Sequence, residues 1–198
     1  EVENVNETQL KNHLTYLASD ELQGRLAGSE GEQKAANYIQ KYFKKLGLKT
    51  HLQPFEYSIK LNPHDENSST PSKGTNVIGY LDNKASKTII IGAHYDHLGL
   101  NQHHQSTLMN SDGQIHNGAD DNASGVSAVM ELARIFAKNK TQEKVNYVFV
   151  LFSAEEDGLI GSKKFAENVK SQYPNVVTMI NMDMVGRLDK DKNLTVGG

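Results

Sequence analysis

From residue 88 onward, the sequence alternates between segments that favour strands and segments that favour helices. Strands are predicted at 88–93, 145–152 and 176–182, and helices at 122–138 and 161–170 lie between them. The first strand reads Thr-Ile-Ile-Ile-Gly-Ala, a β-branched run that is typical of a strand buried on both faces. Strands joined by helices pair in parallel and place the helices on both faces of the sheet. We therefore predict an α/β fold, a three-layer α/β/α sandwich with a mostly parallel mixed central sheet.

The first half of the chain is expected to add two helices and two strands. The helices are predicted over residues 6–19 and 30–46, and the strands over 48–59 and 76–81. Asn6 is a candidate N-cap of the first helix, and Ser29 with Glu32 forms a capping-box pattern at the start of the second. The polar segment 60–74 is rich in Ser, Asn and Pro, and it is expected to be an exposed loop.

Composition excludes several classes of function. The 198 residues hold 21 Lys and Arg against 24 Asp and Glu, and this formal net charge of −3 argues against a strongly basic nucleic-acid-binding surface. The longest unbroken apolar run, Tyr147–Phe152, is far shorter than the roughly 20 residues that a transmembrane helix needs. Cysteine is absent, so disulfides, thiolate metal sites and cysteine nucleophiles are excluded. We expect no nucleic-acid partner and no membrane span.

Acidic residues and histidines follow the predicted strands at the edge where ligands bind in such sheets. Open α/β sheets bind ligands beyond the carboxyl ends of their strands. The residues found there are His94, Asp96 and His97 after strand 88–93, Asp120 and Asp121 before helix 122–138, Glu155, Glu156 and Asp157 after strand 145–152, and Asp183 after strand 176–182. Taken singly, they are ordinary polar loops, helix caps and acidic turns. Together, imidazole and carboxylate groups without thiolates suit Zn, Mn or Co in a hydrolytic site.

Hydrolysis with two metal ions would explain this set of residues. Two cations about 4 Å apart need a carboxylate between them, because a single imidazole cannot bridge. Spacing alone leaves open which of the two aspartates before helix 122–138 is the bridge. Glu155 and Glu156 are adjacent, so their side chains diverge, and one can bind metal while the other transfers protons. Asp96 stands two residues from His94 and suits a partner that fixes the tautomer of that histidine.

Five strings of residues, spread over most of residues 8–187, occur in a recognisable order. They are LASDELQGR from Leu17, GAHYDHLG from Gly92, NGADDNASG from Asn117, FSAEEDGLIGS from Phe152 and NMDMVG from Asn181. In these strings the chain resembles the dinuclear zinc aminopeptidase family, whose relatives include glutamate carboxypeptidase-like enzymes and glutaminyl cyclases. The resemblance implies a metal-dependent exopeptidase, an aminopeptidase that hydrolyses the N-terminal bond of peptides with a free N-terminus.

The same resemblance implies four metal ligands and two residues that assist them. The ligands are His94, Asp121, Glu156 and Asp183, with two zinc ions in the complete domain. Asp121 is the implied bridge between the ions, and its peptide bond to Asn122 is implied to be cis. Glu155 is the implied general base, which activates a metal-bound water, and Asp96 is implied to orient His94.

Two other functions stay open on the same fold. Glutaminyl cyclases are acyltransferases that use a single zinc ion, whereas a full set of bridging and terminal ligands favours two ions and hydrolysis. A catalytically inactive binding module would have lost metal ligands, whereas Glu155 and all four ligands are present. Many enzymes of the family are secreted or periplasmic, and the chain begins Glu-Val-Glu without Met, so we expect a secreted or periplasmic protein.

One part of the family pattern is missing from the chain. The family has a further histidine downstream, which binds the second metal together with the glutamate, and the sequence reaches Gly198 before any such residue. Residues 1–198 are therefore expected to form a single but incomplete zinc peptidase catalytic domain. The imidazole would come either from a segment beyond this chain or from one of the loop histidines, which are His97, His103, His104 and His116.

Overall fold

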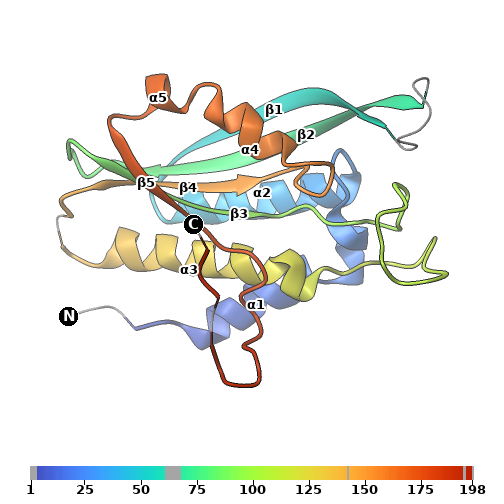
Figure 1. Cartoon of the computed structure of the whole chain (residues 1–198). Coiled ribbons are helices and arrows are strands. Elements are labelled where there is room, and N and C mark those ends of the chain that lie inside the picture. The colour runs from blue at the N-terminus through green and yellow to red at the C-terminus, as the bar shows by residue number, and fades with distance from the viewer. Residues whose placement is uncertain (1–3, 61–67, 142, 194, 198) are drawn as a thin grey trace.

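One five-stranded sheet and the helices around it make up the described chain (Figure 1). The computed structural model describes residues 4–60, 68–141, 143–193 and 195–197. The elements in chain order are α1 (Glu7–Leu17), the 3₁₀ helix η1 (Asp20–Arg25), α2 (Glu30–Lys45), β1 (Lys49–Lys60), β2 (Ser69–Leu81), β3 (Thr88–His94), the π-type turn η2 (Ala119–Ser124), α3 (Gly125–Lys138), β4 (Asn146–Phe152), α4 (Ile160–Ala166), α5 (Val169–Gln172) and β5 (Val176–Asn181). None of the helices in the described ranges is long and apolar enough to cross a membrane.

The strands are ordered β1-β2-β4-β3-β5 across the sheet. β3 pairs in parallel with β4 and with β5, whereas β2 is antiparallel to its neighbours β1 and β4. Four of the five strands therefore run in one direction, which confirms the mostly parallel mixed sheet. His94 is paired with Phe152, and Gly92 is paired with Asn181, so the carboxyl ends of β3, β4 and β5 meet at one edge.

Helices cover both faces of this sheet, as the alternation of strands and helices predicts. α1, α2 and α3 lie on one face, and α4 and α5 lie on the other (Figure 1). Successive residues of a strand point to opposite faces of the sheet. Ile91 therefore belongs to the core that the sheet forms with α2 and α3, while Ile90 belongs to the core that contains Phe165 of α4. Each buried side chain of this size contributes roughly 1.5–3 kcal/mol. The two cores together hold the strand ends that carry the candidate site.

β5 lies at the open edge of the sheet. It pairs with β3 on one side, and no strand of the described chain pairs with its other side. Val177, Met179 and Ile180 are 48%, 43% and 50% exposed. Open edges with apolar side chains invite pairing with further strands. β5 is therefore the least protected strand of the sheet.

The beginnings of both N-terminal helices match the prediction. The Asn6 side chain caps α1 and accepts a hydrogen bond from the Gln9 N–H at 3.0 Å. The Ser29 hydroxyl caps α2 and accepts a hydrogen bond from the Glu32 N–H at 3.1 Å. These side chains satisfy amide groups that a helix cannot pair internally.

The second interaction of the predicted capping box, from the Glu32 carboxylate back to the Ser29 N–H, is not formed; that N–H donates to the main-chain oxygen of Leu26. Instead of returning to Ser29, the carboxylate of Glu32 turns inward and accepts hydrogen bonds from the Gly28 N–H at 2.6 Å and the Tyr95 hydroxyl at 3.1 Å. The Ser153 hydroxyl, at the end of β4, also donates to it. Glu32 is 4% exposed, so a local cap has become a buried link between α2 and the strand ends.

The predicted loop over 60–74 is wrong in its second half. Ser69 to Gly74 belong to β2 and pair with β1, where Ser69 is opposite Lys60 and Gly74 is opposite Phe55. Residues 61–67 of that prediction lie outside the described residues. This hairpin is largely exposed, so its polar side chains stay in water while the backbone pairs.

Two predicted helices also differ in extent. The helix predicted from residue 122 begins at Gly125, because residues 119–124 form η2, where the Asp121–Asn122 peptide bond is cis as the resemblance implies. The helix predicted over 161–170 divides into α4 and α5. The first difference matters for the site, since it places Asp121 in an irregular turn and not in a helix.

Candidate metal centre

Side chains from four segments meet beyond the ends of the parallel strands. His94 closes β3, Asp121 lies in η2, the pair Glu155 and Glu156 follows β4, and Asp183 follows β5. Parallel pairing brings the three strand ends together, and η2 enters α3 beside them. All four predicted ligands and the predicted general base therefore lie in one place, as the rule for α/β sheets anticipates.

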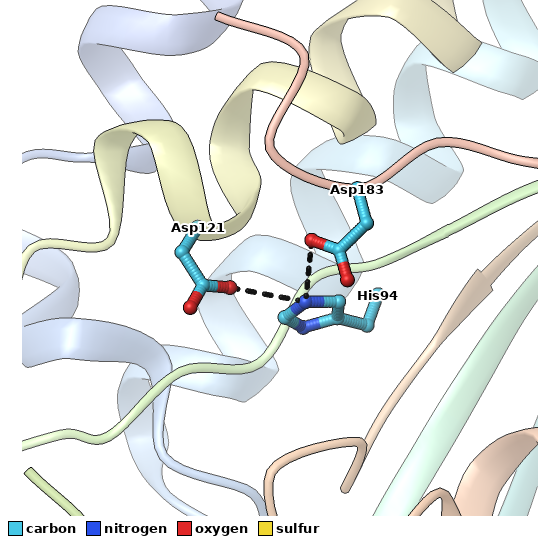
Figure 2. Close-up of side chains that lie close together, drawn as sticks. All are labelled: His94, Asp121 and Asp183. Atoms are coloured by element: carbon cyan, nitrogen blue, oxygen red, sulfur yellow. Dashed lines mark ion pairs between the residues drawn. The ribbon is translucent and has the colours of Figure 1, made fainter. Parts of the chain in front are cut away.

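His94 is the centre of the first cluster. Its Nε2 atom lies 3.1 Å from Asp121 Oδ1 and 3.4 Å from Asp183 Oδ1. Figure 2 shows both carboxylates directed at the same ring nitrogen. The His94 side chain is 2% exposed, whereas those of Asp121 and Asp183 are 38% and 46% exposed. One nitrogen and two oxygens converge on a point that is open on one side.

Asp96 lies behind the ring of His94. The Nδ1 atom of His94 is 3.2 Å from the Asp96 main-chain oxygen and 3.7 Å from its Oδ1 atom. The Asp96 carboxylate also accepts hydrogen bonds from the backbone N–H groups of Glu155 at 3.1 Å and Glu156 at 3.4 Å. Asp96 is thus placed to orient His94, and it also holds the turn that carries both glutamates, a second contact that spacing in the sequence does not reveal.

Asp121 belongs to two clusters at once. Its Oδ1 atom faces His94, while its Oδ2 atom lies 4.0 Å from Nδ1 of His97. Asp120 is turned away, since its Oδ1 accepts a hydrogen bond from the Gly186 N–H at 2.9 Å and its Oδ2 lies 3.7 Å from Nε of Arg187. Of the two adjacent aspartates, Asp121 is therefore the one that can bridge.

Glu156 completes the second cluster. Its Oε1 atom is 2.7 Å from Nδ1 of His97, and these two residues with Asp121 can offer three ligand atoms within 4.8 Å of one another. His97 comes from the loop after β3, three residues beyond His94. This second cluster contains one residue, His97, to which the sequence patterns assign no single role.

Glu155 faces a different space from Glu156. It lines a cavity of about 340 Å³ together with His94 and Asp183. Apolar walls are supplied by Phe152, Leu159 and Met179. A carboxylate that opens onto a cavity beside the first cluster can reach a bound molecule. Glu155 also lies close enough to His94 and Glu156 to form a third group of potential ligands.

The charges of this region do not balance without a cation. Five carboxylates gather here, those of Asp96, Asp121, Glu155, Glu156 and Asp183. Burial alone would lower the pKa of His94, but the neighbouring aspartates raise it to about 12. The pKa of Glu155 is raised by its burial and by the nearby carboxylates, although His94 opposes this. Such a surplus of negative charge around imidazole nitrogens suits a divalent cation, and the donor set of imidazole and carboxylate fits zinc.

Arg25 ties the segments of the site together, and spacing in the sequence does not identify it. The side chain is fully buried and donates hydrogen bonds to the main-chain oxygens of Tyr95 at 2.7 Å, Asn117 at 2.8 Å and Gly118 at 3.0 Å, and to that of Leu17. Burial lowers the pKa of Arg25 to about 10, although nearby carboxylates oppose this. A single guanidinium thus links η1 to the turns before and after the metal ligands; the only hint in the sequence is its place in the string LASDELQGR.

The other three loop histidines lie outside these clusters. His103 Nδ1 is 2.9 Å from Asp157 Oδ1. His104 is exposed and lies 3.4 Å from Asp112. His116 has a buried Nε2 atom without a hydrogen-bond partner in the described chain. Among the four candidates for a local imidazole ligand, the fold brings His97 to the site.

Known proteins are similar to this chain in sequence and in fold. The sequence model for Peptidase family M28 matches residues 76–198, well over half of the chain. A probable zinc metalloprotease of Pyrenophora teres f. teres (strain 0-1) is 45% identical over 78 residues, which cover 39% of this chain and 16% of that protein. The chain spans about half or less of the length of the curated relatives it matches.

Solved structures of the same fold include enzymes of two kinds. The leucine aminopeptidase precursor from Bacteroides thetaiotaomicron VPI-5482 has a TM-score of 0.76 and 20% identity, over 94% of this chain and 64% of that chain. The glutaminyl cyclase of Porphyromonas gingivalis has a TM-score of 0.77 and 18% identity, over 92% of this chain and 62% of that chain. At these identities the likeness establishes the fold. With the family match, it confirms the resemblance seen in the five strings: the chain belongs to Peptidase family M28.

Proposed function

We propose that the chain carries the catalytic centre of a zinc-dependent aminopeptidase. The observation that carries this proposal is the position of Asp121, which directs one carboxylate oxygen toward His94 and the other toward His97 and Glu156. A carboxylate shared between two clusters is what a pair of cations requires. The names of relatives in the family, among them zinc metalloproteases and leucine aminopeptidases, agree with this.

The residues fall into two groups by the atoms they offer. His94, Asp121 and Asp183 would hold one zinc ion, and Asp121 with Glu156 would hold a second. When bound, zinc supplies a Lewis acid that polarises the peptide carbonyl and makes a water molecule more acidic. Asp96 holds His94 from behind and keeps its Nε2 atom directed at the carboxylates.

Glu155 is left free to transfer protons. It faces the cavity while Glu156 faces His97, so it is not needed as a ligand. Its carboxylate accepts a proton from the water that attacks the carbonyl carbon. It then donates that proton to the leaving nitrogen as the carbon–nitrogen bond breaks, which releases an amine and a carboxylic acid. A general base for this reaction must lie beside the metal ligands without being a ligand itself.

The cavity is suited to the N-terminal end of a peptide. It combines the carboxylates of Glu155 and Asp183 with the apolar side chains of Phe152, Leu159 and Met179. Carboxylates attract the ammonium group of a free N-terminus, and the apolar wall can contact a side chain of the substrate. We infer a peptide with an unblocked N-terminus as the substrate.

Cyclisation of N-terminal glutamine is a second candidate, because the fold is shared with glutaminyl cyclases. The two activities differ in the metal they need. A cyclase site would use one cation, whereas the second cluster around Glu156 supports two. A binding module without catalysis is disfavoured, since Glu155 and the four ligands lie together.

The test compares substrates and one variant. The zinc-loaded protein is assayed with leucine p-nitroanilide, with its N-acetyl derivative and with a glutaminyl peptide that releases ammonia on cyclisation. We expect hydrolysis of the unblocked anilide alone. Glu155→Gln should lower kcat by about 10²–10⁴-fold, as for loss of a general base, with zinc content unchanged. Full activity in Glu155→Gln would contradict its role, and ammonia release without anilide hydrolysis would favour the cyclase.

A further inference from the structure

We propose that Glu32 of α2 is a positioning residue for catalysis, because it holds the turn that presents Glu155 to the substrate. The inference rests on the proposed function, in which Glu155 is the general base. Glu32 acts at a distance from the reacting atoms. It acts through two residues at the strand ends, Tyr95 after β3 and Ser153 after β4.

The carboxylate of Glu32 joins the ends of β3 and β4. Its Oε1 atom accepts hydrogen bonds from the hydroxyl groups of Tyr95, at 3.1 Å, and Ser153. Tyr95 directly follows β3, and its N–H donates to the main-chain oxygen of Phe152, the last residue of β4, at 2.9 Å. Tyr95 and Ser153 are fully buried and Glu32 is 4% exposed, so water does not compete for these contacts.

The backbone between Ser153 and Glu155 needs such an anchor. Ala154 has a φ of 53°, in the left-handed region that residues with a Cβ atom adopt only at a cost. A conformation of this kind persists only where the surroundings fix it. Ser153, on one side of Ala154, is held by Glu32 through its hydroxyl group. Its N–H donates to Oδ1 of Asn76 at 3.0 Å.

Close packing confines Ser153 from its remaining sides. A Cβ atom at Gly74 of β2 would lie 2.5 Å from the Ser153 Oγ atom. The main-chain oxygen of Ser153 accepts a hydrogen bond from the Gly161 N–H at 3.0 Å. The hydroxyl group therefore stays directed at Glu32.

A second anchor lies on the other side of the strained residue. The Asp96 carboxylate accepts hydrogen bonds from the N–H groups of Glu155 at 3.1 Å and Glu156 at 3.4 Å. Asp96 directly follows Tyr95, so both anchors involve one short segment after β3. Glu32 thus closes a ring of contacts that determines where the Glu155 carboxylate points. A displacement of about 1 Å at a reacting group can lower a rate by about 10²-fold.

Glu131 of α3 offers a matched control for a role that is only structural. It is a second buried glutamate, 2% exposed, and it accepts a hydrogen bond from the Asn6 N–H at 2.6 Å. It also pairs with Arg134 at 2.8 Å. Its contacts tie α3 to the segment before α1, so its loss should weaken the fold without moving the turn that carries Glu155.

The first experiment measures kcat and kcat/KM of the zinc-loaded protein with leucine p-nitroanilide, at a temperature where circular dichroism shows every variant folded. Glu32→Leu removes the hydrogen-bonding groups and should lower both values by the same factor, about 10²-fold. Glu32→Gln keeps those hydrogen bonds and should recover most of the loss. Glu131→Leu should leave kcat unchanged. Equal values of kcat in Glu32→Leu and Glu131→Leu would overturn the proposal.

A double-mutant cycle tests whether Glu32 acts through Ser153. Ser153→Ala should lower kcat by itself, and it should lower kcat little further when it is added to Glu32→Leu. Fully additive losses would overturn the proposed route. If Glu32→Leu does not fold, Ser153→Ala decides alone, because an unchanged kcat would show that the contact does not position the base.

Amide hydrogen exchange tests the same contacts without turnover. The N–H groups of Glu155 and Glu156 should exchange about tenfold faster in Glu32→Leu than in Glu131→Leu. Equal exchange rates would overturn the positioning role. Faster exchange together with no anilide hydrolysis by the unmodified protein would contradict the proposed function and still support the role of Glu32 in holding the turn.

Discussion

Glu32 gives the fold a pH dependence that can be measured without substrate or metal. Burial raises the pKa of its carboxyl group from 4.5 to about 7, the Asp96 carboxylate adds to this, and hydrogen bonds from Ser153, Gly28 and Tyr95 oppose it. The folded protein therefore keeps a proton on Glu32 up to about pH 7, whereas the unfolded chain releases it near pH 4.5.

The direction of the effect follows from which state holds more protons. Between pH 4.5 and about 7 the folded state binds more protons than the unfolded state, so raising the pH favours unfolding. The stability that this group contributes is complete below pH 4.5 and is lost as the pH rises through about 7. At about 1.4 kcal/mol for each pKa unit, the loss is about 3 kcal/mol.

The perturbation is Glu32→Gln, which keeps the shape of the side chain and removes its titration. The amide can donate to Ser153 and Tyr95 while its oxygen accepts from Gly28. Urea unfolding followed by circular dichroism, in the presence of a chelator, gives the free energy of unfolding of both proteins at a series of pH values.

We expect the advantage of the unmodified protein over Glu32→Gln to shrink by about 3 kcal/mol from acidic to neutral pH. Other titrating groups are common to both proteins, so they cancel in the difference. Two curves that stay parallel across this range would refute the reasoning, because they would mean that Glu32 has the same pKa in the folded and unfolded states.

Three other outcomes are expected. Burial lowers the pKa of His13 from 6.5 to about 4, although Glu131 opposes this. The stability that His13 contributes is therefore present above pH 6.5 and is lost as the pH falls through about 4. In the same urea series, His13→Asn should weaken the fall of the free energy of unfolding at acidic pH, and an unchanged fall would contradict this. Arg25→Met should lower the free energy of unfolding by at least about 3 kcal/mol, since four buried carbonyl groups lose a charged donor. Arg25→Lys should recover little of this loss, because an ammonium group lacks the planar, forked set of donors of the guanidinium. A loss below about 1 kcal/mol in urea unfolding would show that water replaces the guanidinium. Removal of zinc by a chelator, followed by scanning calorimetry, should lower the Tm of the unmodified protein and of Asp120→Asn. The Tm of Asp121→Asn should not change. Equal falls of Tm in all three proteins would contradict the bridging role of Asp121.

Topology made the location of the site predictable from the sequence. The alternation of strands and helices after residue 88 implies parallel pairing, and parallel pairing brings the residues after each strand to one edge. His94, Glu155, Glu156 and Asp183 could therefore be placed together from the order of elements alone. This part of the prediction depended on where strands end, and not on the conformation of any loop.

The sequence could not decide which of several neighbouring residues belongs to the site, because that depends on the conformation of loops and turns. Asp120 and Asp121 are equivalent by spacing, and the turn of η2 decides which carboxylate faces inward. The capping-box pattern named Glu32, but its carboxylate accepts hydrogen bonds from the hydroxyl groups of Tyr95 and Ser153, which follow the ends of β3 and β4. His97 was one of four loop histidines named by the sequence, and the structure places its ring beside Glu156 and Asp121. In each case a contact between distant segments decided the outcome.

The ligands of the first cluster differ in how firmly the fold supports them. His94 ends a strand at the interior of the sheet, whereas Asp183 follows β5, which is exposed and paired on one side. A cation bound by both would act as a crosslink between the interior of the sheet and its exposed edge strand. Loss of metal would then proceed through local opening of β5, and the rate of zinc exchange would follow the hydrogen-exchange rate of the β5 amides. Binding would in turn slow that opening, so the metal would protect the strand that delivers its own ligand.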